Sequence, residues 1–216
     1  MAVAINSNSV AVRGAGTSVS FSYACSSGAN RLFLCGTRTT SGQTFDSGTY
    51  AGSALTNRTN SGVLKTWSIT APATGSNTVS FTMSAYSTGN HVGIADFTGV
   101  DQTTPLGTAS SATGTSGTAS TASITCPSGG MNWGIEANDY VSSGTPTAGS
   151  GTTLAGAFRE GSGGTGMAGG YRSNTGAINL VPGGAPAWRI VGYPINAVPS
   201  VSLTLKRRTL LNLLRM

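Results

Sequence analysis

Large apolar and small polar side chains alternate in several short segments of the chain. The pattern runs through Val19–Tyr23, Val79–Met83, Met131–Ile135 and Trp188–Ile190. Because successive side chains of a β-strand point to opposite faces, it predicts half-buried antiparallel strands with one face in a core and one in solvent. Leu32–Cys35 is apolar at every position, which indicates a central strand covered on both faces.

Turn signals separate these segments, among them Ser41-Gly42, Thr88-Gly89-Asn90 and Pro182-Gly183-Gly184. Many short strands with frequent turns are typical of a sandwich or jelly roll. We therefore expect an all-β protein: an antiparallel, jelly-roll-like β-sandwich in a single domain over residues 1–205. No tandem repeat is evident, and the small-residue stretches Thr108–Ser123, Ser142–Gly151 and Gly161–Gly166 are expected to be loops.

The last residues differ from the rest. Val201–Leu205 reads as a final strand, and residues 206–216 form a short basic, leucine-rich arm. A segment this short is marginal as an isolated helix, so the arm either packs on its own domain or docks on another subunit. The candidate partner-binding residues are Lys206, Arg207, Arg208, Leu210, Leu211 and Leu214.

Charge is scarce over most of the chain. Charged residues make up 8% of the sequence, and the formal charge is +6. Lys206, Arg207, Arg208 and Arg215 supply four of these charges, and subtracting them from +6 leaves +2 for the remainder. A nearly neutral surface favours self-association and gives no reason to expect direct nucleic-acid binding.

The cysteines and the N-terminus give no positive indication of a disulfide, a metal site or a leader segment. Three cysteines without a CxxC spacing predict neither a disulfide framework nor a zinc site, and Cys35 is expected to be a buried thiol. No basic leader followed by an apolar run is visible, and no stretch is apolar enough for a membrane helix. We expect a protein made in a cytoplasm, with no membrane partner.

Catalytic chemistry has few candidates. His91 is the single histidine, no GxSxG motif is present, and no phosphate-binding glycine loop appears. Glu136 is expected to point outward, and Asp96 to be a structural carboxylate that accepts backbone hydrogen bonds. We therefore predict no catalytic, cofactor-binding or metal-binding residues and no cofactor. An enzyme that uses Glu136 or Asp96 with His91 is the weakest alternative.

Exposed aromatic side chains could bind a glycan. Trp133 and Trp188 lie on the apolar side of their segments, which favours a place in the core. Tyr140 and Tyr171 have polar surroundings and are the candidate surface aromatics.

Three parts of the chain carry recognisable motifs: Asn30–Leu34 with Tyr50–Thr56, then Thr66–Val79, then Phe97–Leu106, which together cover much of residues 30–106. Together they resemble a group of jelly-roll-like proteins from tailed phages and bacterial loci. The last segment is expected to be a corner, with Gly99 in a glycine conformation and Asp101 accepting turn amides.

The resemblance implies a virion protein: head decoration, cement or a tail-associated part. The predicted function is thus a non-enzymatic phage capsid decoration or cement protein that binds and stabilises the head shell. Its expected partners are the major capsid protein or other virion subunits and further copies of itself, for example in a trimer. The alternative is a carbohydrate-binding or adhesin-like tail or fibre module.

Overall fold

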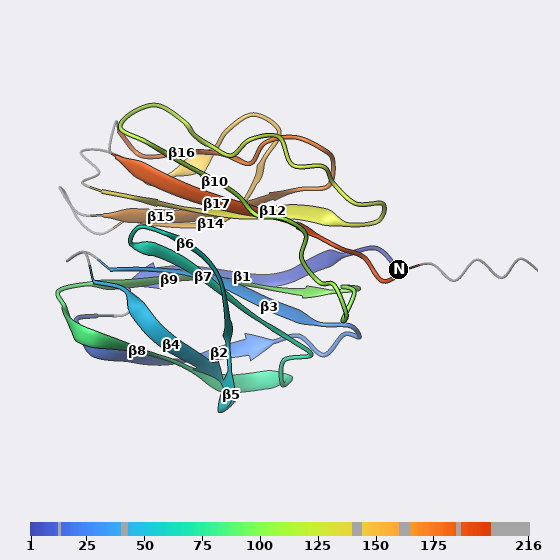
Figure 1. Cartoon of the computed structure of the whole chain (residues 1–216), viewed down its shortest axis with the longest axis horizontal. Coiled ribbons are helices and arrows are strands. Elements are labelled where there is room, and N and C mark those ends of the chain that lie inside the picture. The colour runs from blue at the N-terminus through green and yellow to red at the C-terminus, as the bar shows by residue number, and fades with distance from the viewer. Residues whose placement is uncertain (13, 40–42, 140–143, 160–164, 185–186, 200–216) are drawn as a thin grey trace, which may run out of the picture.

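The computed structural model describes residues 1–12, 14–39, 43–139, 144–159, 165–184 and 187–199. These residues form strands, turns and irregular segments, and the strands are assembled into four sheets. The sheets are stacked as layers (Figure 1). The predicted all-β class is confirmed.

The first half of the chain makes two of the layers. The first outer sheet contains, in spatial order, β2 (Gly16–Cys25), β8 (Gly75–Ser87), β4 (Phe45–Tyr50) and β5 (Ser53–Ala54). The first inner sheet contains β1 (Ala4–Val12), β9 (Asn90–Thr98), β3 (Leu32–Thr39), β7 (Leu64–Thr70) and β6 (Thr56–Ser61). All these pairings are antiparallel.

The second half makes the other two layers. The second inner sheet contains β10 (Ser110–Gly114), β17 (Trp188–Ile195), β12 (Met131–Asn138), β15 (Gly166–Arg172) and β14 (Thr153–Arg159). The second outer sheet contains β11 (Ala119–Ser120), β16 (Asn179–Val181) and β13 (Thr147–Ala148).

Each half has the strand order of a jelly roll. In that fold one sheet holds the first, eighth, third and sixth strands, and the other holds the second, seventh, fourth and fifth. With β6 set aside, the first half reproduces this order as β1-β9-β3-β7 over β2-β8-β4-β5. The second half repeats this order as β10-β17-β12-β15 over β11-β16-β13. The additional strand β14 lies at the edge of the second inner sheet, as β6 lies at the edge of the first.

The chain is therefore a double jelly roll, a repeat of topology that the sequence did not reveal. It also corrects two expected loops, because β10 and β11 lie within Thr108–Ser123 and β13 lies within Ser142–Gly151. Among the described residues of the second half, no strand corresponds to β5.

Three apolar cores lie between successive layers. The first-roll core includes Phe33, Trp67 and Phe81, and the second-roll core includes Ile178, Trp188 and Ile190. The central core joins the two inner sheets and includes Leu32, Leu34, Phe97, Trp133, Ile135 and Val191. The predicted core positions of Trp133, Trp188 and Cys35 are confirmed by their burial.

Strands of the inner sheets are covered on both faces. All eight residues of β3 are buried, as predicted for its apolar part. All eight residues of β12 are buried as well, although its alternation predicted a half-buried strand. The cause is the stacking of the two rolls: a strand of an inner sheet lies between two cores and is buried at polar and apolar positions alike.

The corner expected over Phe97–Leu106 connects the rolls. Gly99 has φ of +74°, and a Cβ there would lie 2.3 Å from the carbonyl oxygen of Ala2. Asp101 accepts hydrogen bonds from the amides of Thr103 and Thr104 at 2.8 and 3.3 Å, and these bonds lower its pKa. The predicted turn roles of Gly99 and Asp101 are confirmed.

Candidate functional site

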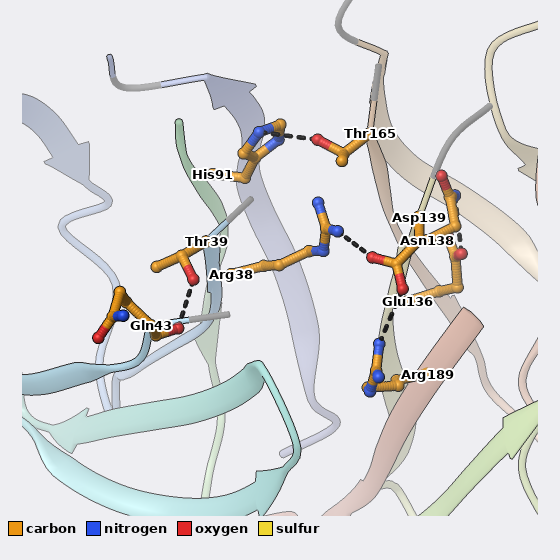
Figure 2. A network of polar contacts seen from close by, with 9 residues as sticks. All are labelled: Arg38, Thr39, Gln43, His91, Glu136, Asn138, Asp139, Thr165 and Arg189. Carbon is orange, nitrogen blue, oxygen red and sulfur yellow. Dashed lines mark hydrogen bonds and ion pairs between the residues drawn. The ribbon is translucent and has the colours of Figure 1, made fainter. Parts of the chain in front are cut away.

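A group of charged and polar side chains, three of them buried, lies at one end of the central core, where the two rolls meet. We call this group, which consists of Arg38, His91, Asp139, Thr165 and Arg189, the polar seam (Figure 2). Arg38 on β3 and His91 on β9 are directly opposite in the ladder, so their side chains share a face of the first inner sheet.

Because side chains alternate along a strand, the position of each residue shows which roll its side chain faces. Gly36, two residues before Arg38, would bring a Cβ within 2.7 Å of Ile135 on β12. Arg38 has the same parity and therefore also faces the second roll. Arg189 on β17 has the parity of Val191, a member of the central core, and faces the first roll.

Asp139 is the carboxylate of the seam. It accepts a hydrogen bond from Nη2 of Arg38, and one from Nη1 of Arg189 at 3.3 Å. Arg38 has a side-chain exposure of only 2%, against 33% for Asp139. Burial lowers the pKa of Arg38, and the charge of Asp139 opposes that shift. One carboxylate thus ties a guanidinium from each roll.

The guanidinium of Arg38 is only partly satisfied. Its Nε and Nη1 atoms are buried, and no hydrogen-bond partner for them lies among the described residues. Unpaired buried donors of this kind are costly, so the salt bridge to Asp139 carries most of the compensation for burying this charge.

His91 is a structural histidine in this arrangement. It is fully buried, its Nε2 atom lies 3.0 Å from Oγ1 of Thr165, and the ring of Phe158 packs edge-on at 6.0 Å. Burial, with a smaller contribution from the charge of Arg38, lowers its pKa to about 4. The imidazole is therefore neutral at pH 7 and joins the first roll to the second by a hydrogen bond.

Glu136 is buried, so the prediction that it points outward is wrong. It is 0% exposed, because both faces of β12 are covered. Its Oε1 atom accepts a hydrogen bond from Nδ2 of Asn138 at 2.8 Å. Burial raises its pKa to about 8, partly offset by that hydrogen bond and by the charge of Arg38. Glu136 therefore carries its proton at neutral pH.

Asp96 lies in a different network, inside the first roll. It accepts hydrogen bonds from the hydroxyls of Ser7 and Tyr23, the latter at 3.0 Å, and from the amide of Ser26 at 3.0 Å. Its predicted structural role as an acceptor of backbone hydrogen bonds is confirmed. Among the described residues, no hydrogen bond links Asp96 to His91 or Glu136.

The candidate surface aromatics are placed differently from expectation. Tyr171 lies within β15 and is half-buried against the central core, not in a polar loop. Tyr140 lies outside the described residues, as do Lys206, Arg207, Arg208, Leu210, Leu211 and Leu214. The most exposed aromatic side chain in the described part of the chain is Tyr86, at 62%.

Both the seam and Tyr86 have a signal in the sequence. Tyr86 continues the outward parity of Ser80 and Thr82 along β8. Arg38 continues the parity of Leu32 and Leu34 along β3, which places a charge on a buried face. A lone arginine at such a position indicates a buried partner, but the sequence does not say that Asp139 supplies it.

Comparisons with family models, curated proteins and solved structures found no match for this chain. In its described residues, no helix could cross a membrane, and no three His, Cys, Asp or Glu side chains come together as a metal site would require.

Proposed function

We propose that this protein is a non-enzymatic structural component of a virus particle, a capsid decoration or cement protein that binds the head shell. The double jelly roll is the observation that carries the proposal. Jelly rolls recur in viral capsid proteins and in lectin domains. A chain that stacks two of them through a shared core makes a rigid block suited to a load-bearing surface.

The polar seam supports a structural role. Arg38, Asp139 and Arg189 form an ion-paired group that joins the rolls, and His91 and Thr165 add a hydrogen bond across them. These are the groups from which a catalytic constellation would be drawn, and each has a structural partner. Such cross-links oppose sliding of one roll over the other.

The surface of the first outer sheet is also suited to contacts with protein. Its outward positions are hydroxyl-bearing, with Ser22 bonded to Ser76 and Ser47 bonded to Thr82, each at 2.6 Å between oxygens. Asp46 is the one charged residue in the four strands of this sheet, so long-range repulsion toward a shell of other subunits is weak. The proposed partner is the major capsid protein, and the protein would reach the particle from the host cytoplasm.

The direct test is quantitative mass spectrometry of gradient-purified particles from the source of this chain. We expect many copies per particle, and we expect particles stripped of the chain to lose heat resistance and to regain it on re-addition. Purified particles without the chain would contradict the proposal.

A truncation tests the attachment arm. Removing residues 206–216 should weaken rebinding to stripped particles if the arm docks on the shell. Unchanged rebinding would place the contact on the jelly rolls instead.

A glycan array tests the alternative function, a carbohydrate-binding tail or fibre module. Binding that is lost in Tyr86→Ala, Tyr140→Ala or Tyr171→Ala would favour that alternative. The half-buried position of Tyr171 lowers its value as a stacking platform.

A further inference from the structure

Strand β10 forms one edge of the second inner sheet. It is hydrogen-bonded to β17 on one side, and in the described part of the chain no strand pairs with its other side. Alternate residues of an edge strand direct their amide and carbonyl groups away from the sheet, where another chain can pair with them. The outer side of β10 is therefore a candidate surface for strand pairing.

β10 lacks the features that protect sheet edges. Natural proteins block such edges with charged residues, prolines, bulges or very short strands. β10 contains no charged residue and no proline, and its five residues are a usual strand length. All five residues pair with β17 in one unbroken register, from Ser110 opposite Gly192 to Gly114 opposite Trp188.

Each of the other edge strands among the described residues has at least one protective feature. The pairing of β1 and of β2 is interrupted near the first residues of each strand. β6 and β14 each contain a bulge and an arginine, Arg58 and Arg159. β5, β11 and β13 have two residues each. Within the described residues, β10 is thus the unprotected edge.

Side-chain contacts hold both ends of β10 in place. At its start, Oγ of Ser110 accepts a hydrogen bond from the amide of Ala122 at 3.1 Å. Beyond its end, the indole Nε1 of Trp188 donates to the carbonyl oxygen of Ser116 at 2.9 Å. Gly114 lets this indole lie close, because a Cβ there would be 2.4 Å from its Cζ2 atom. An edge that is already fixed loses little further entropy when it pairs.

The first roll leaves β10 accessible. On this flank its edge strand β6 lies against β17, where the hydroxyl of Tyr193 donates to Oγ1 of Thr59 at 2.6 Å. Ser111 and Thr113 point to the side of the first roll, because Ala112 packs on the second-roll core, yet both are exposed. β10 therefore projects past the first roll, and a second strand can approach its edge.

We propose that β10 pairs antiparallel with β10 of a second copy of this chain, so that the second inner sheets of two molecules become one continuous sheet. The self-complementarity of β10 selects a second copy as the partner. With the pairing centred on Ala112, Ser111 lies opposite Thr113, and Ser110 lies opposite Gly114. A hydrogen bond between hydroxyl groups stabilises a Ser–Thr pair, and no two charges meet.

The symmetry of this contact predicts a closed dimer. Antiparallel pairing of identical edges requires a two-fold axis normal to the sheet, and a two-fold contact uses the same surface of both molecules. No edge of β10 is then left for a third copy. The interface is a property of the purified chain and does not depend on the virion assignment.

Sedimentation velocity of the full chain over a range of concentrations tests the proposal. We expect a monomer–dimer equilibrium. Ser111→Lys combined with Thr113→Lys places lysine opposite lysine at two positions and should raise the dissociation constant by about tenfold or more. Thr82→Lys combined with Ser84→Lys, at two exposed positions of the interior strand β8, is the matched control and should leave the dimer intact.

A charge-swap experiment makes the assignment sharper. Ser111→Asp combined with Thr113→Asp should also dissociate the dimer. An equal mixture of the aspartate and lysine variants should restore it, because opposite charges then meet at both positions. Melting temperatures close to that of the unmodified chain would show that the variants fold.

Amide hydrogen exchange gives a test that needs no variant. Amides of residues 110–114 should become better protected at concentrations where the dimer forms, and those of the edge strand β6 should not change. A chain that stays monomeric at every concentration would overturn the proposal. So would a dimer that the lysine variant of β10 leaves intact, a mixture that stays dissociated, or protection of β10 that is independent of concentration.

Discussion

At the scale of single residues, Arg38 and Asp139 form the contact on which the polar seam depends. Asp139→Ala leaves the guanidinium of Arg38 buried without its carboxylate, and we expect a loss of about 3 kcal/mol in the free energy of unfolding. Urea denaturation measures this loss. Asp46→Ala, which removes an exposed carboxylate, should change stability by less than about 0.5 kcal/mol. Similar losses in both variants would mean that the ion pair contributes nothing specific.

Glu136 should make stability depend on pH. Its pKa rises from 4.5 to about 8 on folding, so the native chain holds an extra proton and stability falls as pH rises between these values. His91 acts in the opposite direction, since its pKa drops from 6.5 to about 4 and stability rises with pH across that range. The effects of Glu136 and His91 on stability oppose each other up to pH 6.5. From pH 6.5 to about 8, the loss of stability due to Glu136 is no longer offset by His91.

The measurement is the free energy of unfolding from pH 5 to 8.5. We expect a decline of up to about 1.4 kcal/mol per pH unit above pH 6.5, the limit for one proton. Glu136→Gln cannot ionise and should remove that decline. A wild-type profile that is flat above pH 6.5 would contradict the burial of an ionisable Glu136.

At the scale of elements, strands β3 and β12 approach closely because Gly36 has no side chain. A Cβ at Gly36 would lie 2.7 Å from the side chain of Ile135, which is fully buried. Gly36→Ala should therefore cost about 1–3 kcal/mol through overpacking of the central core. Gly169 on β15 has its nearest neighbours at 3.9 Å, so Gly169→Ala is the matched control and should be close to neutral in the same denaturation assay.

At the scale of the whole molecule, the two rolls should unfold together because they share the central core. Each core contains one tryptophan: Trp67 in the first roll, Trp133 between the rolls and Trp188 in the second roll. In each of three variants that keep one tryptophan, with phenylalanine at the other two, fluorescence should report the same denaturation midpoint as far-UV circular dichroism. The sequence predicts one cooperative domain over residues 1–205. A fluorescence midpoint that departs from that of circular dichroism in the Trp67 or the Trp188 variant would contradict this prediction.

The element pattern was largely readable from the sequence. Alternation located the strands around Phe21, Phe81 and Trp188, and the apolar run at Leu32–Cys35 correctly predicted a strand covered on both faces. The very short strands of the second half were missed, because two or three residues are too few to show a period. The polar seam was missed because its members lie far apart in the sequence.

Sequence alone determined that this chain is all-β and which side chains share a face of each strand, since both follow from local alternation and turn residues. Only the tertiary structure decided how many faces are covered. Alternation places Glu136 on the face of β12 opposite to Trp133 and Ile135. It cannot tell that the first roll covers one face of this strand and the second outer sheet covers the other. That outcome depends on long-range strand pairing, which repeats one topology in two halves and stacks them through a common core.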